Sequence, residues 1–278
     1  MREIDRTLVV DTVADLCIKA NTEMGEDLVS ALKEAREKEE SDVGKEILEI
    51  ILENIEIARN EQIPACQDTG TAVVFVEIGE DVSFSYNLTD AIFEGVRKGY
   101  QEGFLRKSMC DPITRKNTKD NTPPIIHYEF VPGDKLKITV APKGGGSENM
   151  SEARVFAPAA GIEGIKDFVV DRVERSQANP CPPIIVGVGI GGNFEHSTYL
   201  AKKALLRNIG QRHPEKFYAQ VERELKERIN RLGIGPQGLG GRFTCLDVFV
   251  EYSPCHVASL PVAVNINCHV ARHKSKVL

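Results

Sequence analysis

Apolar side chains in the first sixty residues recur at intervals of three or four positions, which is the spacing of one face of an α-helix. Two groups follow it: Val9, Val13, Leu16 and Ala20, and then Ile47, Ile51, Ile55 and Ala58. This spacing predicts a helical lead-in over residues 3–59. A charged run from Glu37 to Asp42 interrupts it, and we expect that run to be a solvent-exposed helix end.

Beyond residue 61 the pattern changes to short runs rich in β-branched residues, separated by longer stretches with helical spacing. The short runs predict strands at residues 72–78, 125–130, 136–141, 183–190, 244–251 and 262–266. The stretches predict helices near residues 87–106, 161–178, 194–208 and 214–232. No Ser/Pro-rich linker or repeat divides the chain. We therefore expect an α/β fold in a single domain, with a helical portion at 1–60 and a mixed sheet flanked by helices at 61–278.

The composition excludes several classes of protein. The 278 residues include 35 Lys and Arg against 41 Asp and Glu, a formal net charge of −6, with both signs mixed along the chain. Because there is no basic stripe, nucleic-acid binding is not expected. No apolar run approaches the ~20 residues of a transmembrane helix, and the first residues lack an apolar signal-peptide core. We expect a soluble, cytoplasmic protein without a membrane partner.

The cysteines change the picture. There are seven of them, an odd number in a long chain without a signal peptide, so a disulfide framework is not expected and thiolate or metal chemistry is more natural. Three share one kind of context, a Pro-, Gly- or Asn-rich turn beside an apolar run: Cys66, Cys181 and Cys268.

Two interpretations of these three thiols remain open on spacing alone. A free cysteine is usually a small buried hydrophobic residue. Tight turns, however, can position thiolates and aim backbone N–H groups at cluster sulfurs. Three such thiols can hold a four-iron cluster and leave one iron without a protein ligand, and such an iron can act as a Lewis acid toward a hydroxyl and carboxylate.

A third interpretation uses other residues as zinc ligands. Cys255, His256, Cys268 and His273 would stabilise a non-catalytic binding module, and Cys66 and Cys181 would then be dispensable. The chain contains no CxxC knuckle, which weakens this reading.

One glycine motif resembles a dinucleotide-binding fingerprint. Gly187, Gly189 and Gly192 follow a predicted strand and precede a predicted helix, in the spacing GxGxxG. The acidic residue expected about 20 positions later is missing. We therefore expect these glycines to allow tight backbone packing beneath Cys181.

Four segments together resemble the iron–sulfur hydro-lyases of the class I fumarase and L-tartrate dehydratase type. They are the CQDTG stretch from Cys66, the KGGGSEN stretch from Lys143, the GIGPQGLGG stretch from Gly233, and the HVASLPVAVN stretch from His256. The resemblance covers nearly the whole chain. It implies a [4Fe-4S] cluster held by Cys66, Cys181 and Cys268, with one iron not ligated by protein.

Two residues are candidates for proton transfer. Asp68 lies two positions after Cys66, so its carboxylate would lie close to a substrate at the open iron; the alternative is an Asx-turn into Thr69 and Gly70. His256 is a lone histidine, and such a histidine more often has a structural role than a catalytic one. The resemblance makes it a polar group that could orient the leaving hydroxyl or shuttle its proton.

The same resemblance implies the substrate-binding groups. Gln67 would contact the substrate, and Arg106 would fix a carboxylate with its bidentate fork, although an arginine at a helix end is usually just solvated. Consecutive glycines can aim N–H groups at an anion, so Gly144, Gly145 and Gly146 would form a carboxylate nest, the alternative being a flexible turn.

The resemblance also implies the reaction and the partner. The chain would be the α subunit of an enzyme that interconverts S-malate and fumarate, a tricarboxylic acid cycle step, or else of an L(+)-tartrate dehydratase that converts tartrate to oxaloacetate. Single-chain members continue beyond the point where this chain stops, at Leu278, so a separate β subunit and an α2β2 heterotetramer are expected. The remaining cysteines match no ligand position and are read as core or incidental: Cys17, Cys110, Cys245 and Cys255.

Overall fold

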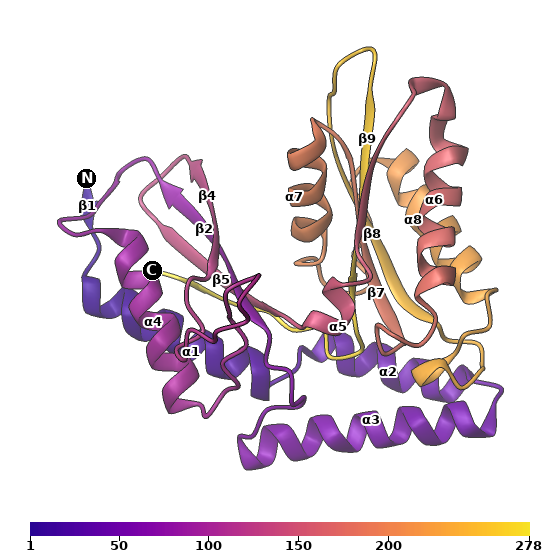
Figure 1. Cartoon of the computed structure of the whole chain (residues 1–278), viewed down its shortest axis with the longest axis horizontal. Coiled ribbons are helices and arrows are strands. Elements are labelled where there is room, and N and C mark those ends of the chain that lie inside the picture. The colour runs from indigo at the N-terminus through magenta and orange to yellow at the C-terminus, as the bar shows by residue number, and fades with distance from the viewer. The chain divides into compact units, whose positions relative to one another are not determined.

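The computed structural model describes all 278 residues, and they form two compact units. Unit 1 is built from three stretches of chain: Met1–Gly25, Asn54–Gly145 and Arg272–Leu278. Unit 2 is built from Glu26–Glu53 and Gly146–Ala271. Each unit has its own sheet, its own helices and its own hydrophobic core (Figure 1).

Three helices form the first sixty residues, as the apolar spacing predicts. They are α1 (Arg6–Thr22), α2 (Glu26–Lys38) and α3 (Asp42–Glu61). α1 begins where it does because the Asp5 side chain accepts a hydrogen bond from the backbone N–H of Leu8, satisfying one of the free donors at the helix start. The helical lead-in is therefore confirmed.

The charged run after α2 is not simply solvated, because Glu39 is only 2% exposed. Its carboxylate accepts hydrogen bonds from the backbone N–H groups of Glu40, Ser41, Arg242 and Phe243. These N–H groups lie in tight turns and have no partner in a helix or strand, so a carboxylate that reaches them is stabilised although it is buried. The expectation of a solvent-exposed helix end was wrong for this residue.

Unit 1 contains a four-stranded sheet in the order β10-β5-β2-β4. Its strands are β2 (Thr71–Gly79), β4 (Ile125–Val131), β5 (Leu136–Lys143) and β10 (Lys274–Val277). β2 pairs parallel with β4 and antiparallel with β5, and β10 joins β5 antiparallel. A small parallel pair, β1 (Arg2–Glu3) and β3 (Val82–Ser83), was not predicted.

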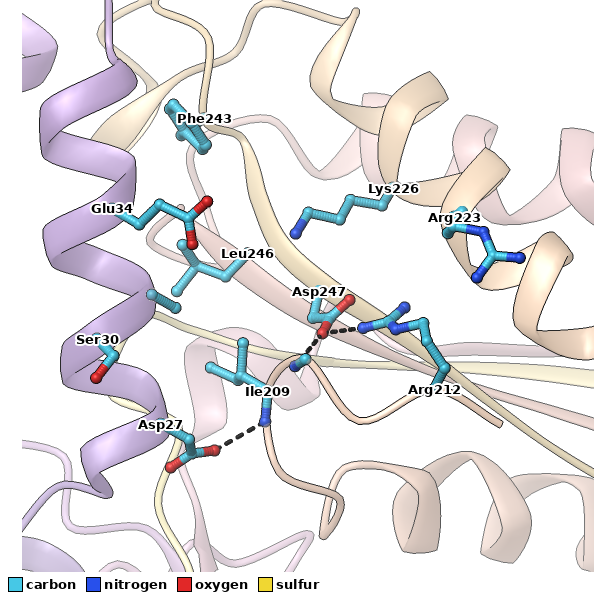
Figure 2. A pocket seen from close by; sticks show the side chains of 12 residues that line it. Asp27, Ser30, Glu34, Ile209, Arg212, Arg223, Lys226, Phe243, Leu246 and Asp247 are labelled. Atoms are coloured by element: carbon cyan, nitrogen blue, oxygen red, sulfur yellow. Dashed lines mark hydrogen bonds and ion pairs between the residues drawn. The ribbon is translucent and has the colours of Figure 1, made fainter. Parts of the chain in front are cut away.

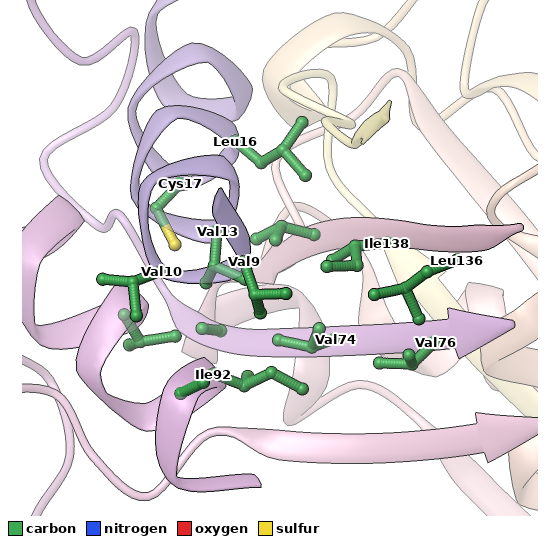
Figure 3. Close-up of a cluster of buried hydrophobic side chains, with 14 of the residues drawn as sticks. Val9, Val10, Val13, Leu16, Cys17, Val74, Val76, Ile92, Leu136 and Ile138 are labelled. Carbon is green, nitrogen blue, oxygen red and sulfur yellow. The ribbon is translucent and has the colours of Figure 1, made fainter. Parts of the chain in front are cut away.

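The core of unit 1 lies between this sheet and two helices, α1 and α4 (Leu88–Glu102) (Figure 3). Alternate residues of β2, such as Val74 and Val76, join Val9 and Val13 of α1 in this core. Cys17 is fully buried among them, and burial raises the pKa of its thiol to about 12. Its interpretation as a core residue is confirmed.

Unit 2 contains a second four-stranded sheet, in the order β6-β9-β7-β8. Its strands are β6 (Glu152–Phe156), β7 (Ile184–Gly191), β8 (Cys245–Ser253) and β9 (Leu260–Asn267). β7 is parallel to β8 and antiparallel to β9, which also pairs antiparallel with β6. All eight residues of β7 are buried, as expected for a central strand covered on both faces.

The helices of unit 2 cover both faces of this sheet, α7 (Phe194–Ala204) on one side and α6 (Gly161–Ser176) and α8 (Lys216–Asn230) on the other (Figure 1). Short helical turns occur at α5 (Gly145–Glu148), η1 (Pro158–Ala160) and η2 (Pro236–Gly238). The α/β fold class is confirmed, and every predicted strand and helix is present. None of the helices combines the length and apolar character needed to cross a membrane.

The glycines of the GxGxxG motif serve close packing, and their neighbour is α7. A Cβ atom added to Gly187 would lie 2.1 Å from the carbonyl oxygen of Ala201, and one added to Gly189 would lie 2.0 Å from that of Ser197. Only glycine allows the backbones of β7 and α7 to come this close. The motif is therefore explained by packing and not by a dinucleotide.

Candidate functional site

The loop that carries Cys66 connects α3 to β2 in unit 1, and hydrogen bonds on both sides of Ala65 hold it. The backbone N–H of Ala65 donates to the carbonyl of Asn21 over 3.0 Å, and its carbonyl accepts from the side-chain amide of Asn54 over 2.8 Å. The backbone N–H of Asp68 points at the sulfur of Cys66, 3.4 Å away. An N–H group directed at sulfur is also the kind of hydrogen bond found around the cysteine ligands of iron–sulfur clusters.

Asp68 accepts three hydrogen bonds within unit 1. Its Oδ1 accepts the N–H of Gly70 over 3.0 Å, which is the Asx-turn considered as an alternative. Its Oδ2 accepts the N–H of Gly145 over 2.7 Å, and its main-chain carbonyl accepts Nη2 of Arg272. Asp68 therefore forms the Asx-turn with one carboxylate oxygen and binds the glycine loop with the other.

The glycine loop after β5 meets Asp68 directly. A Cβ atom on Gly144 would lie 3.2 Å from Oδ2 of Asp68, so a side chain there would push against the carboxylate. The N–H of Gly145, predicted to bind a substrate carboxylate, is donated to Asp68 in this structure. Gly146 begins the part of the chain in unit 2, where its nearest neighbour is the carbonyl of Asn179.

Arg106 follows the end of α4, and its side chain is exposed. Its main-chain carbonyl accepts the hydroxyl of Thr69 over 3.1 Å, so the arginine is tied to the same loop as Cys66 and Asp68. The phenol of Tyr100 supports this loop from the core, within 3.0 Å of the carbonyls of Thr69 and Gly70. Burial raises the pKa of Tyr100 well above its ordinary value, so the phenol stays a neutral donor.

Cys181 and Cys268 belong to unit 2, where the structure brings their loops together. The backbone N–H of His269, the residue after Cys268, donates to the carbonyl of Cys181 over 3.2 Å, and its Nδ1 lies 2.9 Å from the same oxygen. Gln237 completes the contact, because its side-chain amide bonds the carbonyl of Pro182 and lies 3.0 Å from Nδ1 of His269. Cys181 itself has φ +55°, a conformation that tight turns impose.

His256 lies elsewhere in unit 2, in the exposed loop that connects β8 to β9. The whole of β9 separates it from Cys268, and eight extended residues span about 26 Å at ~3.3 Å each. Within unit 2 the structure therefore does not bring His256 to Cys268, although the two are only 12 positions apart in sequence.

The same strand contradicts the zinc interpretation. Cys255 and His256 lie at one end of β9 and Cys268 at the other, and Cys255 uses its thiol on the carbonyl of Ser259. An extended strand cannot fold its two ends around one ion. Neither unit by itself gathers three or more His, Cys, Asp or Glu side chains into a group that could hold a metal.

The donor chemistry of the other three thiols still fits an iron–sulfur cluster. Cys66 and Cys268 are half-buried and Cys181 is exposed, whereas Cys17 and Cys245 are fully buried with their pKa raised to about 12. No disulfide consumes any of the seven. Iron–sulfur clusters take thiolates, so the accessible cysteines are the suitable ones. Cys66 belongs to unit 1 and the other two to unit 2.

Two of the matched segments also meet inside unit 2. Glu148, from the KGGGSEN stretch, accepts the side-chain amide of Asn265, from the HVASLPVAVN stretch, over 3.1 Å, and Lys202 of α7 bonds its other oxygen. Polar residues of separate segments are thus held in one partly buried network.

Arg272 is the residue that the sequence reading missed. It is 5% exposed, it contacts the main chain of Asp68, and its Nε and Nη1 atoms have no acceptor. Its position four residues after Cys268 was the only signal in the sequence that could have drawn attention to it.

A cavity of about 440 Å³ lies apart from these residues, within unit 2 (Figure 2). α2, α8, the start of β8 and the loop before α8 form its walls. Asp27 accepts the N–H of Ile209 over 2.8 Å, and Asp247 accepts the N–H of Gly210 over 2.7 Å and bonds Arg212. These carboxylates are satisfied by the protein itself: Asp27 joins α2 to the loop, and Asp247 joins β8 to it. None of the predicted site residues lines the cavity.

Comparison with known proteins places the chain among hydro-lyases. The family model described as fumarate hydratase (Fumerase) matches residues 10–277. A protein of Methanocaldococcus jannaschii, provisionally named L(+)-tartrate dehydratase subunit alpha, is 46% identical over 275 residues, covering 96% of each chain. L(+)-tartrate dehydratase subunit alpha of Escherichia coli strain UTI89 is 35% identical over 268 residues, covering 95% of this chain and 88% of that protein. The protein of the same name from strain K12 is 34% identical over the same length. The chain therefore belongs to the fumarate hydratase family of hydro-lyases and corresponds to the alpha subunit of its two-subunit members.

Proposed function

We propose that the chain is the cluster-bearing alpha subunit of a hydro-lyase that adds water to, or removes it from, a C4 dicarboxylate. The proposed substrate pair is S-malate and fumarate. L(+)-tartrate is the alternative, and it has equal support because the relatives reported above are named L(+)-tartrate dehydratases. The observation that carries the proposal is the Cys66 loop, which holds a thiolate-compatible cysteine, Asp68 and the glycine loop against one another.

Cys66, Cys181 and Cys268 would hold a [4Fe-4S] cluster. All three thiols are at least partly accessible, and the loops of the last two are already joined through His269. When bound, a cluster with one iron free of protein ligands supplies a Lewis acid for the hydroxyl that leaves or enters.

Asp68 would exchange the proton on the substrate carbon. Its carboxylate is held at both oxygens by backbone N–H groups, so it keeps one orientation, and it lies two residues from Cys66. A fixed carboxylate is suited to taking a proton from carbon and returning it in the reverse reaction.

The remaining predicted residues would hold the substrate. Gln67 lies between Cys66 and Asp68 with its side chain exposed, and Arg106 offers an exposed guanidinium on the neighbouring segment. Gly144, Gly145 and Gly146 would supply backbone N–H donors, which requires Gly145 to release Asp68 as substrate enters. His256 would act as an orienting or proton-shuttling group.

We further propose a β subunit that completes the active site, an α2β2 heterotetramer, and a cytoplasmic location. The support for the partner is the pair of E. coli relatives named as alpha subunits, which this chain matches over most of their length.

One experiment tests this function. The chain is purified without oxygen together with its co-expressed β subunit, iron and sulfide are measured, and dehydration of S-malate and of L(+)-tartrate is followed side by side. We expect iron and sulfide to copurify, a three-iron paramagnetic resonance signal after mild oxidation, and turnover of one or both diacids. Zinc in place of iron, or turnover of neither diacid by the iron-loaded complex, would contradict the proposal.

A further inference from the structure

Arg272 is a buried cation without a counter-ion. Its side chain is 5% exposed, and the one acceptor it reaches is the main-chain carbonyl of Asp68. Nε and Nη1, which together carry three N–H donors, are buried and have no hydrogen-bond acceptor. No carboxylate lies within ion-pair distance of the guanidinium. All of these atoms belong to unit 1.

Such an arrangement is costly for a protein at rest. A buried charge is normally paired, and leaving one unpaired destabilises a fold by several kcal/mol. Buried unpaired donors of this kind are rare in folded proteins, and they mark places where a ligand supplies what the chain lacks. The missing partner of Arg272 must be an anion, because arginine stays protonated under all ordinary conditions.

The surroundings of Arg272 indicate where this anion would come from. A Cβ atom on Gly144 would lie 4.0 Å from Nη2 of Arg272 and 3.2 Å from Oδ2 of Asp68, so one glycine touches both groups. Gly144 is half-exposed and Gly145 is exposed, so the glycine loop beside Nη2 of Arg272 lies at the surface. Release of the Gly145 N–H from Asp68 would free this loop to move.

We propose that Arg272 binds a carboxylate of the substrate, the one attached to the carbon from which Asp68 takes its proton. This rests on the proposed function. Removal of that proton delocalises negative charge into the adjacent carboxylate, so a cation beside Asp68 is where stabilisation is needed most. A guanidinium with two free nitrogen atoms is suited to a carboxylate, since its planar fork can donate two parallel hydrogen bonds.

Arg272 and Arg106 then divide the two carboxylates of the diacid. Arg106 is exposed and tied to Thr69 through its main chain, and Arg272 is buried and tied to Asp68. The two arginines belong to different segments of unit 1, and both are bonded to the CQDTG stretch that begins at Cys66. A substrate with a single carboxylate would leave one of them unpaired, so the proposal predicts a preference for diacids.

The test measures binding and not turnover. Wild-type αβ complex, Arg272→Lys and the control Arg2→Lys are titrated without oxygen with succinate, an unreactive diacid, and with butyrate, which has one carboxylate. Arg2 is a suitable control because its guanidinium also donates to backbone carbonyls of unit 1, those of Asp134 and Leu278. Iron, sulfide and the melting temperature are recorded for each variant.

We expect Arg272→Lys to weaken succinate binding about tenfold or more, because lysine keeps the charge but loses the fork. Butyrate binding should change by a much smaller factor, and Arg2→Lys should leave both affinities and the iron content as in the wild type. Equal losses for succinate and butyrate would overturn the proposal, since a residue that only holds the main chain of Asp68 would weaken both alike.

Two further outcomes would also overturn it. A wild-type complex that does not bind succinate would leave Arg272 without its proposed ligand. Loss of iron and sulfide from Arg272→Lys, with succinate affinity unchanged, would assign the missing anion to the cluster. Absence of malate or tartrate turnover in the wild type would count against the proposed function alone, because the succinate titration does not depend on turnover.

Discussion

At the scale of single residues, the cysteines occupy two kinds of environment, a buried core and accessible turns. Cys17 and Cys245 are fully buried, and this burial raises the pKa of both thiols to about 12. Cys66, Cys181 and Cys268 lie in turns and are at least partly accessible. The turn context of Cys66, Cys181 and Cys268 could be read from the sequence, whereas Cys17 and Cys245 were set aside because the resemblance gives them no ligand position.

This difference predicts the pattern of thiol alkylation. At about pH 8 a thiol with pKa about 12 is a thiolate in only ~1 molecule in 10,000, and burial blocks the reagent as well. Iodoacetamide should therefore leave Cys17 and Cys245 unmodified in the native, cluster-free chain, and mass spectrometry of the peptides should show it. In the unfolded chain all seven should react; rapid labelling of Cys17 under native conditions would contradict the buried environment.

Asp68 gives the second prediction at this scale. Asp68→Asn keeps the size of the side chain and one acceptor oxygen but cannot take a proton, so the turnover rate should fall at least ~100-fold while iron and sulfide stay at wild-type levels. The control is Asp134→Asn, which changes an exposed carboxylate in a loop of the same unit and should leave the rate unchanged. Wild-type turnover by Asp68→Asn would remove this residue from proton transfer.

At the scale of elements, turns and backbone hydrogen bonds hold the loops that carry the predicted site residues. The Cys66 loop is fixed between α3 and β2, and the loops of Cys181 and Cys268 are fixed to one another through His269. Glu39 has a similar role at the end of α2, where its buried carboxylate accepts hydrogen bonds from the backbone N–H groups of Arg242 and Phe243.

Glu39 carries a pH-dependent prediction. Burial raises the pKa of its carboxyl. The backbone hydrogen bonds from Arg242, Ser41, Phe243 and Glu40 together lower this pKa by more than burial raises it, so the pKa lies below its ordinary value. A depressed pKa means that the ionised carboxylate stabilises the fold above the pKa of the unfolded chain, and that this stabilisation is lost as the pH falls through the folded-state pKa.

We therefore expect Glu39→Gln to lower the free energy of unfolding by about 1–3 kcal/mol at neutral pH, since backbone donors lose a charged acceptor. Urea unfolding at several pH values should show the gap to wild type narrowing from about pH 5 downward. Glu40→Gln is the control, because that carboxylate is exposed and its ion pair with Arg242 is largely solvated. A gap that widens in acid would contradict the direction of the shift.

At the scale of the whole molecule, the sequence anticipated the class of fold but not its division. The chain leaves unit 1 after Gly25, returns at Asn54, leaves again after Gly145 and returns at Arg272. No change of composition marks these crossings. They follow from which strands pair, and β10 joins β5 across more than 130 positions of sequence.

The proposed partner is tested at this scale too. If a β subunit completes the site, the cluster-loaded chain alone should dehydrate S-malate or L(+)-tartrate at no more than ~1% of the rate of the reconstituted complex, because substrate-positioning groups on the partner would be missing. Full activity of the isolated chain would contradict the two-subunit proposal. Iron and sulfide should be equal in both samples, so that any loss of rate cannot be assigned to loss of the cluster.

The sequence by itself determined the periodic elements and the residues able to do chemistry. Helical spacing at Val9 and Val13, and β-branched runs such as residues 72–78, specify local conformation, because the alternation of buried and exposed positions is written in neighbouring residues. Cys66 and Asp68 could be predicted as site residues because they share one short motif, and the turn that contains them is local.

Only the tertiary structure decided which distant residues meet. The segment of Cys268 reaches the Cys181 loop, whereas His256 lies at the opposite end of β9, although it is only 12 positions from Cys268 in sequence. Glu39 is buried by a turn 200 positions away, and Arg272 lies against Asp68 with its charge unpaired. Such contacts depend on how sheets and crossings assemble, and no local pattern of residues encodes that assembly.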